Sequence, residues 1–186
     1  MHQSDKKRHI FLTGFMGAGK SRIGKTLAEQ FGYPFYDSDD LIELAAGKKI
    51  REIFEQDGER VFRSIESAEI KKLCRINDPA VISLGGGAVQ SEENFKLVQK
   101  HGVSVYLASS PEAIMNRVKN SNKRPLLDVG EGEDFEQRLL EKIKELLDLR
   151  IPVYERSDIA VERDGLELEE IVALIYKKIQ IYRKPE

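Results

Sequence analysis

The sequence predicts an α/β fold of three layers, in which a five-stranded parallel sheet is covered by helices on both faces. Short apolar runs alternate with amphipathic segments along the whole of the 186 residues. The apolar runs are nearly continuous, which is typical of parallel strands that are buried on both faces. No break in composition and no internal repeat divides the chain, so we expect a single domain over residues 1–186.

The first half of the chain opens with the apolar run HIFLTG, residues 9–14, which predicts the first strand. Residues 20–31 place apolar side chains on one helical face and predict a helix. The second strand is expected within residues 33–39, in the run YPFYDSD. The helices expected after it are two short ones, over about 39–46 and 50–54, and a long one over about 59–75.

The second half continues the alternation. Residues 80–84 predict a third strand that leads into three consecutive glycines, and a helix is expected from about Ser91. A fourth strand is expected over residues 103–109. The next helix has a clear start, because Ser110 can cap it and Pro111 suits its first position.

The last third of the chain begins with a polar segment, residues 120–134, whose Asn, Gly and charged residues predict a loop. A long helix is expected over about 135–150, and Pro152 is expected to end it. A fifth strand over residues 158–162 and an amphipathic helix over residues 168–182 complete the fold.

Composition excludes several classes of function. The chain is 40% hydrophobic and 33% charged with a net charge of −2, which does not favour a general nucleic-acid binder. No apolar run approaches the roughly 20 residues that cross a bilayer, and the polar start MHQSDKKRH leaves no room for a signal peptide. The one cysteine, Cys74, is expected to pack in a helix, which fits a reducing cytoplasm. Three scattered histidines are too few for a metal cluster or a Ser-His triad.

The motif GFMGAGKS is the strongest functional signal in the chain. Gly14, Gly19, Lys20 and Ser21 match the phosphate-binding pattern G-x-x-x-x-G-K-[ST], and the motif lies between a predicted strand and a predicted helix. Glycines let backbone N–H groups turn toward phosphate oxygens, and the helix N-terminus adds a partial positive charge. Lys20 would reach the terminal phosphates, and Ser21 would coordinate Mg²⁺. The motif therefore predicts that the chain binds a nucleoside triphosphate.

Other nucleotide-binding classes fit less well. A dinucleotide site would carry a third glycine where this chain has Arg22. A GTPase would contain Asp-x-x-Gly and Asn-Lys-x-Asp segments, and neither occurs. A motor ATPase would place a magnesium-binding Asp at the end of an apolar strand, whereas the third strand ends in glycines and the fourth in Ala and Ser.

The run FYDSDD places acidic residues only at the end of the second strand. Asp37 and Asp39 are two positions apart, so on an extended chain their side chains would point to the same side. One could serve the metal ion and the other a hydroxyl group that is phosphorylated. The alternative is that they only cap the following helix, a role that Asp40 or Asp39 could also fill.

Three arginines are candidates for binding an anionic substrate, because the planar guanidinium matches a carboxylate. Arg63 lies near the start of the long helix and has Glu66 on the same face to orient it. Arg124 lies in the polar loop, and Arg150 comes just before Pro152. Taken singly, each could equally be a solvated surface residue.

Together these motifs resemble the shikimate kinase family, which consists of small single-domain P-loop kinases. The resemblance covers about residues 10–180. The motifs that carry it, in order, are GFMGAGKS, FYDSD, IFEQDGERVFRSIE, ISLGGGAV, RPLL and RIPVYE. The resemblance implies a P-loop kinase fold with a substrate-binding helical segment over about 38–75 and a mobile lid over about 120–134. It also implies ATP-dependent phosphorylation of the 3-hydroxyl of shikimate in chorismate and aromatic amino-acid biosynthesis, with Mg²⁺ as the cofactor and a cytoplasmic monomer as the active form.

The resemblance assigns roles to individual positions. It implies that ATP is bound by Gly17, Ala18, Gly19, Lys20, Ser21, Arg22, Arg117 and Arg124, with Arg117 near the adenine. It implies that shikimate is bound by Asp39, Arg63, Gly85, Gly86, Gly87 and Arg150, with both arginines on the carboxylate. Lys20, Asp39 and the lid residue Arg124 would be catalytic, and Ser21 and Asp37 would serve Mg²⁺, Asp37 directly or through the second shell. Whether Asp39 removes the proton or only orients the hydroxyl is left open.

Three glycines at residues 85–87 then have an explanation. A polyhydroxylated ring would lie against this backbone, and a Cβ atom would intrude on it, whereas a wide turn would explain only one or two glycines. The sequence departs from the family at Arg22, where a Thr usually follows the loop, and residues 162–170 receive no adenine contact. The rival hypotheses are another small-metabolite kinase, such as a gluconate kinase or an adenylate-kinase relative, and a nucleotide-binding pseudokinase with a regulatory role.

Overall fold

The computed structural model describes residues 7–119, 125–130 and 132–184. Five strands form a single sheet in the order β2-β3-β1-β4-β5, and each neighbouring pair is parallel. The strands are β1 (His9–Thr13), β2 (Phe35–Asp37), β3 (Val81–Ser83), β4 (Gly102–Ala108) and β5 (Ile159–Glu162). The predicted five-stranded parallel sheet is therefore confirmed.

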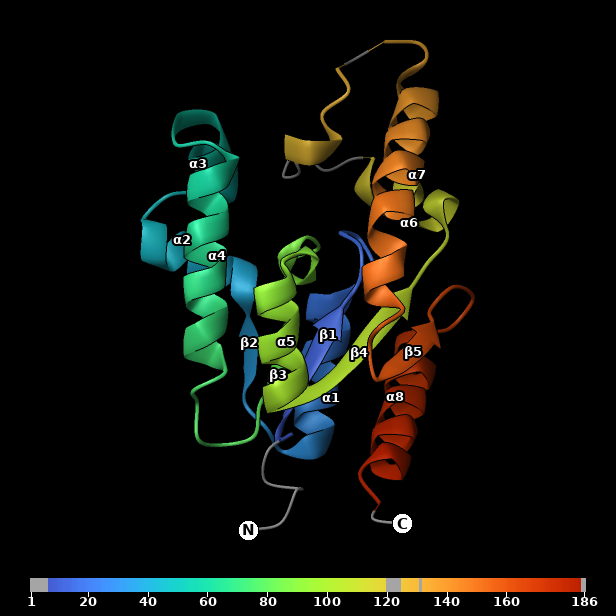
Figure 1. Cartoon of the computed structure of the whole chain (residues 1–186). Coiled ribbons are helices and arrows are strands. Elements are labelled where there is room, and N and C mark those ends of the chain that lie inside the picture. The colour runs from blue at the N-terminus through green and yellow to red at the C-terminus, as the bar shows by residue number, and fades with distance from the viewer. Residues whose placement is uncertain (1–6, 120–124, 131, 185–186) are drawn as a thin grey trace.

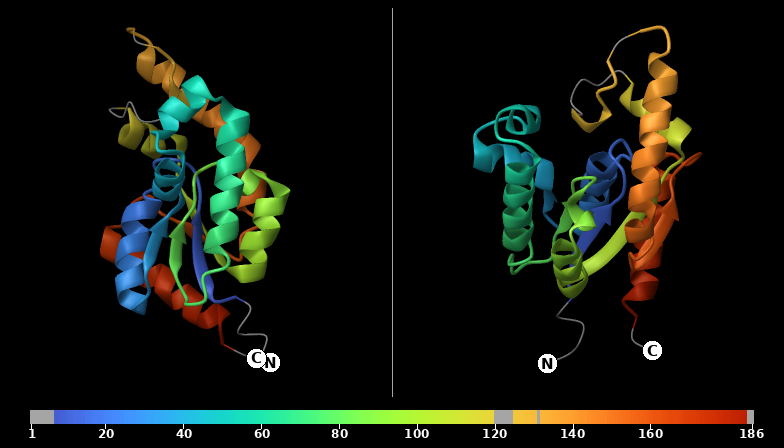
Figure 2. Two further views of the ribbon diagram at one scale, coloured as in Figure 1. Left: turned by 90° about the vertical axis from the view of Figure 1, so that its left-hand side faces the viewer. Right: turned by 45° about the horizontal axis from the view of Figure 1, so that its top comes forward.

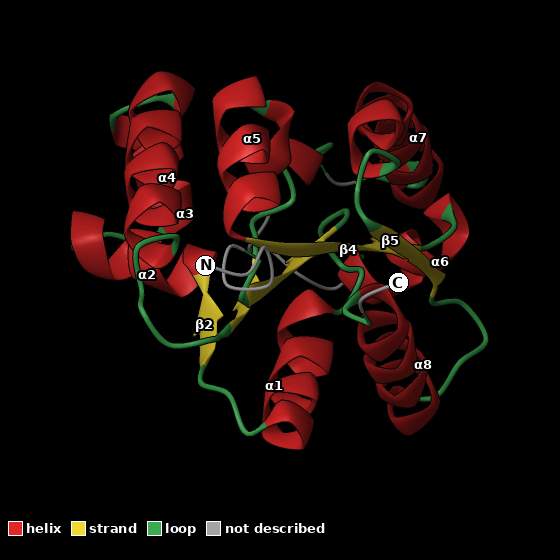
Figure 3. Cartoon of the chain, turned by 60° about the horizontal axis from the view of Figure 1, so that its bottom comes forward, coloured by secondary structure: helices red, strands yellow, loops and turns green. Residues whose placement is uncertain are grey.

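Helices cover the sheet on both faces, which gives the three layers seen in Figure 3. One face is covered by α1 (Lys20–Phe31) and α8 (Leu168–Tyr182). The other face is covered by α4 (Glu59–Leu73), α5 (Glu92–His101) and α7 (Phe135–Tyr154). The shorter elements are α2 (Ser38–Ala46), α3 (Ile50–Gln56), α6 (Pro111–Val118) and the 3₁₀ turns η2 (Ala88–Gln90) and η3 (Pro125–Leu127).

Alternation along the strands divides the core between the two faces. In β1, Ile10 and Leu12 pack with α1 and α8, whereas Phe11 packs with α4, α5 and α7. All three side chains are fully buried. Because both faces of the central strand are apolar, the strand reads as a continuous hydrophobic run, as the sequence analysis expected.

A separate small cluster holds α2, α3 and α4 together. Ile42, Ile53 and Phe62 form its buried centre, and Phe54 lies against Phe62 with ring centroids 4.6 Å apart. These helices gather beyond the β2 edge of the sheet, while α6 and α7 lie toward β5 (Figures 1 and 2). The expected substrate-binding segment, residues 38–75, thus has a small buried cluster of its own that joins its three helices.

Two expectations about local structure are wrong. Helix α7 does not end before Pro152 but continues to Tyr154. Proline removes one helical N–H and crowds the carbonyl four residues earlier, yet here it lies in the last turn, and the fully buried ring of Tyr154 stabilises that turn by packing against Tyr106 at 5.0 Å. In addition, β2 ends at Asp37, so Asp39 lies in the first turn of α2 and not on an extended chain.

The loops that follow parallel strands lie at one edge of the sheet, and ligands of open α/β sheets bind at this edge. Here the edge carries the phosphate-binding motif after β1, the acidic residues after β2 and the three glycines after β3. Residues 120–124 and 131 of the predicted lid, residues 120–134, lie outside the described residues, and Arg124 is one of them. Within the described part of the chain, no helix is both long and apolar enough to span a membrane.

Candidate active site

The phosphate-binding motif forms a tight loop between β1 and α1. Gly14 and Gly19 have φ angles of 132° and 85°, which L-residues with a side chain rarely adopt. A Cβ atom on Gly14 would also lie 2.7 Å from the carbonyl oxygen of Leu107. No side chain caps the N-terminus of α1, and its first turn contains no acidic residue. The first N–H groups of this helix are therefore available to an anion.

Lys20 lies inside this loop. Its side chain is buried, and its Nζ donates hydrogen bonds to the carbonyl oxygens of Gly14 at 2.8 Å and Phe15 at 3.0 Å. These contacts hold the ammonium group beside the uncapped end of α1. A fixed cation next to free backbone N–H groups is the arrangement that binds the terminal phosphates of a nucleotide.

Ser21 and Asp37 bring two hard oxygen ligands together. The Ser21 hydroxyl donates a hydrogen bond of 2.5 Å to Asp37 Oδ2, and Asp37 Oδ1 accepts one from the backbone N–H of Asp39 at 3.0 Å. Asp37 is thus the N-cap of α2, so the capping role considered from the sequence is real and belongs to Asp37.

The same pair of oxygens suits Mg²⁺. The ion usually keeps several waters and takes only one or two protein oxygens beside the phosphates of its substrate. Among the described residues there is no cluster of three or more His, Cys, Asp or Glu side chains that could hold a metal ion alone. Ser21 and Asp37 therefore fit a Mg²⁺ that arrives with a nucleotide.

Two arginines flank the phosphate loop on the β4 and β5 side. Arg117 donates to Asp164 Oδ1 at 3.0 Å and to the carbonyl oxygen of Gly17 at 3.4 Å. Arg163 lies against the loop, because a Cβ atom on Gly19 would be 3.2 Å from its Nε. Burial and the nearby positive charges of Arg117 and Arg22 lower the pKa of Arg163. Arginine side chains therefore lie close together beside the loop.

A pocket lies beside the phosphate loop, from which Met16 contributes to its wall. Its apolar wall is formed by Met16, Ile50, Phe54, Phe62 and Leu126. Its polar lining is formed by Asp39, Arg63, Glu66, Arg150 and the glycines 85–87. All the residues predicted to bind the second substrate therefore line one pocket, although they come from four separate segments of the chain.

Arg63 is fixed in this pocket by carboxylates of its own helix. Its Nη1 donates to Glu66 Oε2 at 2.8 Å, which confirms that Glu66 lies on the same face and orients it. Its Nε and Nη2 donate to Glu59 Oε1 at 3.2 and 3.0 Å. Burial raises the pKa of Glu66 although the guanidinium of Arg63 opposes this, and Glu66 Oε1 is buried without a hydrogen-bond partner.

Arg150 enters the pocket from α7. Its side chain is buried, and its Nη1 has no hydrogen-bond partner among the described residues. The guanidinium lies over the ring of Phe15, 5.3 Å from its centroid. A buried donor without a partner costs about 1–3 kcal/mol, so this group is arranged to receive an acceptor from a ligand.

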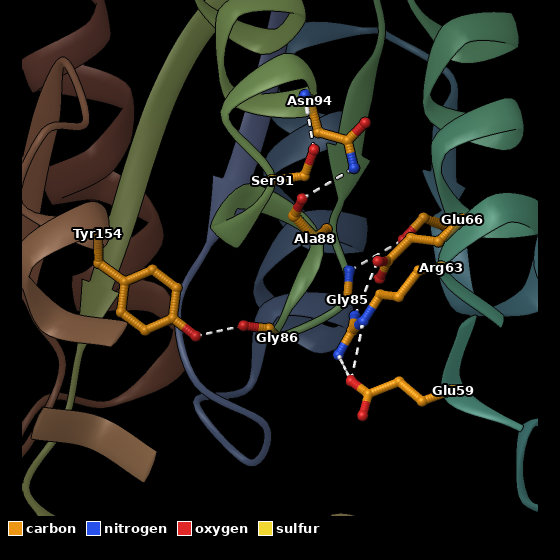
Figure 4. A network of polar contacts seen from close by, with 10 residues as sticks. Glu59, Arg63, Glu66, Gly85, Gly86, Ala88, Ser91, Asn94 and Tyr154 are labelled. Carbon is orange, nitrogen blue, oxygen red and sulfur yellow. Dashed lines mark hydrogen bonds and ion pairs between the residues drawn. The ribbon is translucent and has the colours of Figure 1, made fainter. Parts of the chain in front are cut away.

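The three glycines are packed against the protein itself (Figure 4). A Cβ atom on Gly85 would lie 2.7 Å from Asp39 Oδ1, and one on Gly87 would lie 2.6 Å from Arg63 Nη1. A Cβ atom on Gly86 would lie 3.0 Å from the backbone nitrogen of Met16. The glycines therefore let the two polar side chains and the phosphate loop approach this backbone, a reason that comes before any contact with a substrate ring.

Hydrogen bonds hold this glycine segment from two sides. The N–H of Gly85 donates to Ser38 Oγ at 2.9 Å, and the Tyr154 hydroxyl donates to the carbonyl oxygen of Gly86 (Figure 4). Burial raises the pKa of Tyr154, so the hydroxyl stays protonated and can donate. The sequence analysis did not single out Ser38 or Tyr154, because neither residue type marks a site until the fold brings it to the glycines.

Arg163 and Glu59 were also missed. Arg163 belongs to residues 162–170, for which the sequence alone offered no contact. The structure marks it as a candidate because its buried Nε lies beside Gly19 and has no hydrogen-bond partner among the described residues. Glu59 could have been found from its spacing, since it lies four residues before Arg63 on one helix face.

Comparisons with known proteins agree with one another. Residues 16–180 match the family model described as "Shikimate kinase". A shikimate kinase of Thermodesulfovibrio yellowstonii is 42% identical over 173 residues, covering 93% of this chain and 95% of that protein. One from Chlorobaculum tepidum is 40% identical over 172 residues, covering 92% and 90%. The solved structure "Shikimate kinase from Acinetobacter baumannii in complex with shikimate" matches with a TM-score of 0.87 and 32% identity over 97% of both chains.

Proposed function

The chain belongs to the shikimate kinase family, and from this premise we propose that it transfers the terminal phosphoryl group of ATP to the 3-hydroxyl of shikimate. The products are shikimate 3-phosphate and ADP, and the reaction serves chorismate and aromatic amino-acid biosynthesis. The Acinetobacter baumannii enzyme was solved in complex with shikimate, and its structure matches 97% of this chain. This match supports shikimate as the acceptor.

One observation carries the proposal. A pocket lined by two guanidinium groups and two carboxylates adjoins the phosphate loop, and the Met16 nitrogen would lie 3.0 Å from a Cβ atom on Gly86. An acidic polyol bound by Arg63 and Arg150 would thus lie with a hydroxyl toward the nucleotide. This supports phosphoryl transfer to an alcohol of a small carboxylic acid, a reaction that depends chiefly on positioning and charge stabilisation.

The residues of the phosphate loop bind and orient the nucleotide. Backbone N–H groups of Gly17, Gly19 and the first turn of α1 would donate hydrogen bonds to phosphate oxygens. Ala18 is assigned to the same loop, where its N–H donates to the carbonyl oxygen of Phe15 at 3.1 Å and holds the turn. The Lys20 ammonium group neutralises charge on the transferred group. Arg22, Arg117 and Arg124 are assigned to the nucleotide as well, with Arg117 toward the base and Arg124 as the closing residue of the lid, residues 120–134.

A bound Mg²⁺ would supply positive charge that offsets the negative charge developing on the phosphates. Ser21 and Asp37 would hold it, and their hydrogen bond supports this assignment because both oxygens already converge on one point. Asp37 keeps this orientation through its bond to the N–H of Asp39.

Asp39 acts on the acceptor hydroxyl. It lines the pocket in the first turn of α2, next to the capping residue Asp37. Both roles considered from the sequence, proton removal and orientation of the hydroxyl, remain compatible with this position. Arg63, Arg150 and the backbone of residues 85–87 fix the ring, and the helices within residues 38–75 form its outer wall.

We further propose that the enzyme acts as a cytoplasmic monomer. Among the described residues, the substrate pocket and the phosphate loop adjoin each other, which supports a site that needs no residue from a second copy. ATP is produced and used in the cytoplasm, which supports that location.

The experiment that tests the proposal measures ADP release by the purified protein with ATP, Mg²⁺ and one acceptor at a time. Shikimate should give turnover, and gluconate and AMP should not. Turnover with gluconate or AMP alone would favour another small-metabolite kinase, and nucleotide binding without turnover would favour a pseudokinase.

A further inference from the structure

Arg63 is surrounded by protein groups on each edge of its guanidinium. Glu66 accepts from Nη1, and Glu59 accepts from Nε and Nη2 (Figure 4). The end of the guanidinium faces Gly87, because a Cβ atom there would lie 2.6 and 2.8 Å from Nη1 and Nη2. A substrate carboxylate can therefore form a two-point contact with Arg63 only if one of these groups gives way.

The two glutamates differ sharply in how easily they can move. The Glu66 side chain is 2% exposed, so its carboxylate is held in place by the surrounding protein. The Glu59 side chain is 56% exposed and lies in the first turn of α4, where it can rotate into solvent. Ion pairs of this exposed i,i+4 kind are weak. Glu59 is consequently the partner that yields.

The charges around the pocket lead to the same conclusion. Arg63 and Arg150 are matched by Asp39 and Glu66, so the pocket without Glu59 is neutral. Glu59 adds a further negative charge beside Arg63, and a substrate carboxylate would add another. Two carboxylates that compete for one guanidinium edge repel each other, so the arrival of the substrate favours the departure of Glu59. Arg150 Nη1, which is buried and has no hydrogen-bond partner, supplies a second contact that a ligand gains and Glu59 does not use.

We propose that Glu59 occupies Arg63 in the substrate-free enzyme in place of the substrate carboxylate, and that binding of the substrate displaces it into solvent. Glu59 is then a specificity-determining residue. A ligand with a carboxylate competes with it, whereas a ligand with a neutral group at that position leaves it in place. The inference rests on the proposed function, since it assumes that Arg63 binds the carboxylate of shikimate.

The opposite role would be purely structural. Glu59 could hold Arg63 in its productive orientation, as Glu66 does, and its loss would then weaken substrate binding. The two roles predict opposite changes in shikimate affinity for one variant, Glu59→Gln. This substitution removes the charge and keeps the size of the side chain.

The test measures the dissociation constant of shikimate by calorimetry in the presence of ADP, for wild type, Glu59→Gln and Glu59→Ala. The matched control is Glu55→Gln, because Glu55 is also 56% exposed and forms an i,i+4 ion pair with Arg51 outside the pocket. Both Glu59 variants should bind shikimate about two- to five-fold more tightly, the equivalent of one exposed ion pair, and the control should not change. The carboxamide analogue of shikimate should gain no affinity from the substitutions.

Equal or weaker binding of shikimate by Glu59→Gln, in protein whose melting temperature matches wild type, would overturn the inference. So would an equal gain for the carboxamide, because the effect would not then depend on competition between carboxylates. Failure of the wild type itself to bind shikimate would overturn the proposed function and the inference together, and this result is distinct from both of the others.

Discussion

The hydroxyl of Ser21 and the carboxylate of Asp37 meet in a hydrogen bond of 2.5 Å that joins the start of α1 to the end of β2. Ser21 and Asp37 are sixteen residues apart in sequence. Their contact links the phosphate loop to the segment that carries Asp39. Two hard oxygens are thereby fixed where the phosphates of a nucleotide would end.

This contact predicts a magnesium phenotype for Asp37→Asn. The substitution removes the charge, and asparagine still caps α2 as well as aspartate does. Loss of one charge-assisted contact, worth about 1.5–3 kcal/mol, should raise the Mg²⁺ concentration needed for half-maximal activity about ten- to a hundred-fold. Titration of Mg²⁺ at fixed ATP measures this, with Asp40→Asn in the same helical turn as the control. An unchanged Mg²⁺ requirement would remove Asp37 from the metal site.

Asp39→Asn separates the acceptor side from the nucleotide side. A positioned carboxylate that acts as a general base contributes about 10²–10⁴-fold, so kcat should fall by that order while the affinity for ATP is kept. Steady-state kinetics with nucleotide binding measured separately provide the comparison. Parallel losses in ATP affinity and in kcat would instead place Asp39 on the metal ion.

Arg150→Ala should weaken shikimate about ten- to a hundred-fold and leave ATP binding nearly unchanged. The reason is that its buried, unpartnered Nη1 would lose a charge-assisted hydrogen bond to the substrate. Arg156→Ala is the matched control, because Arg156 lies just beyond the same helix and pairs with Glu92 outside the pocket. Similar affinities for shikimate in the two variants would contradict the assignment of Arg150 to the carboxylate.

His9 predicts how stability changes with pH. It is fully buried at the start of β1, and burial, followed by the nearby charge of Arg8, lowers the pKa of His9 from 6.5 to about 4. Between pH 6.5 and about pH 4, His9 is therefore protonated in the unfolded chain and neutral in the folded chain. The contribution of neutral His9 to stability is complete above pH 6.5 and is lost as the pH falls toward 4. The difference between the two pKa values of His9 corresponds to about 3 kcal/mol in the free energy of unfolding.

The measurement is the free energy of unfolding by urea at pH 7 and at pH 4.5, for wild type and His9→Gln. The variant should lose less stability between the two values, and His101→Gln serves as the control because His101 is only partly buried. The same loss in wild type and His9→Gln would show that other groups account for the acid sensitivity.

Much of this molecule could be predicted from its sequence because local signals and the fold agree. The phosphate loop combines backbone requirements at Gly14 and Gly19 with a helix start, and such a pattern is local. The Ser110 cap and the Pro111 start of α6 are local as well, and the structure has both. The strand order and the identity of the pocket residues could be inferred only through the family resemblance, since they depend on contacts between distant segments.

The errors arose where tertiary contacts override a local rule. Pro152 normally ends a helix, but burial of Tyr154 continues α7 past it. Alternation along a strand placed Asp37 and Asp39 on one side, but the helix begins at Ser38, and the two are related instead by a cap. The assignment of the three glycines to the substrate stays a prediction, and the structure adds that Asp39 packs against Gly85 and Arg63 against Gly87. A sequence pattern can mark a close approach without naming the group that approaches.

The most direct test of the account identifies the product. The protein is incubated with ATP, Mg²⁺ and shikimate, and the product is examined by phosphorus–proton correlation in NMR. The account predicts one new phosphate ester whose phosphorus couples to the proton on carbon 3 of the ring, formed in equal amount to ADP. Phosphate on another hydroxyl, or ADP formed without any phosphorylated shikimate, would contradict it.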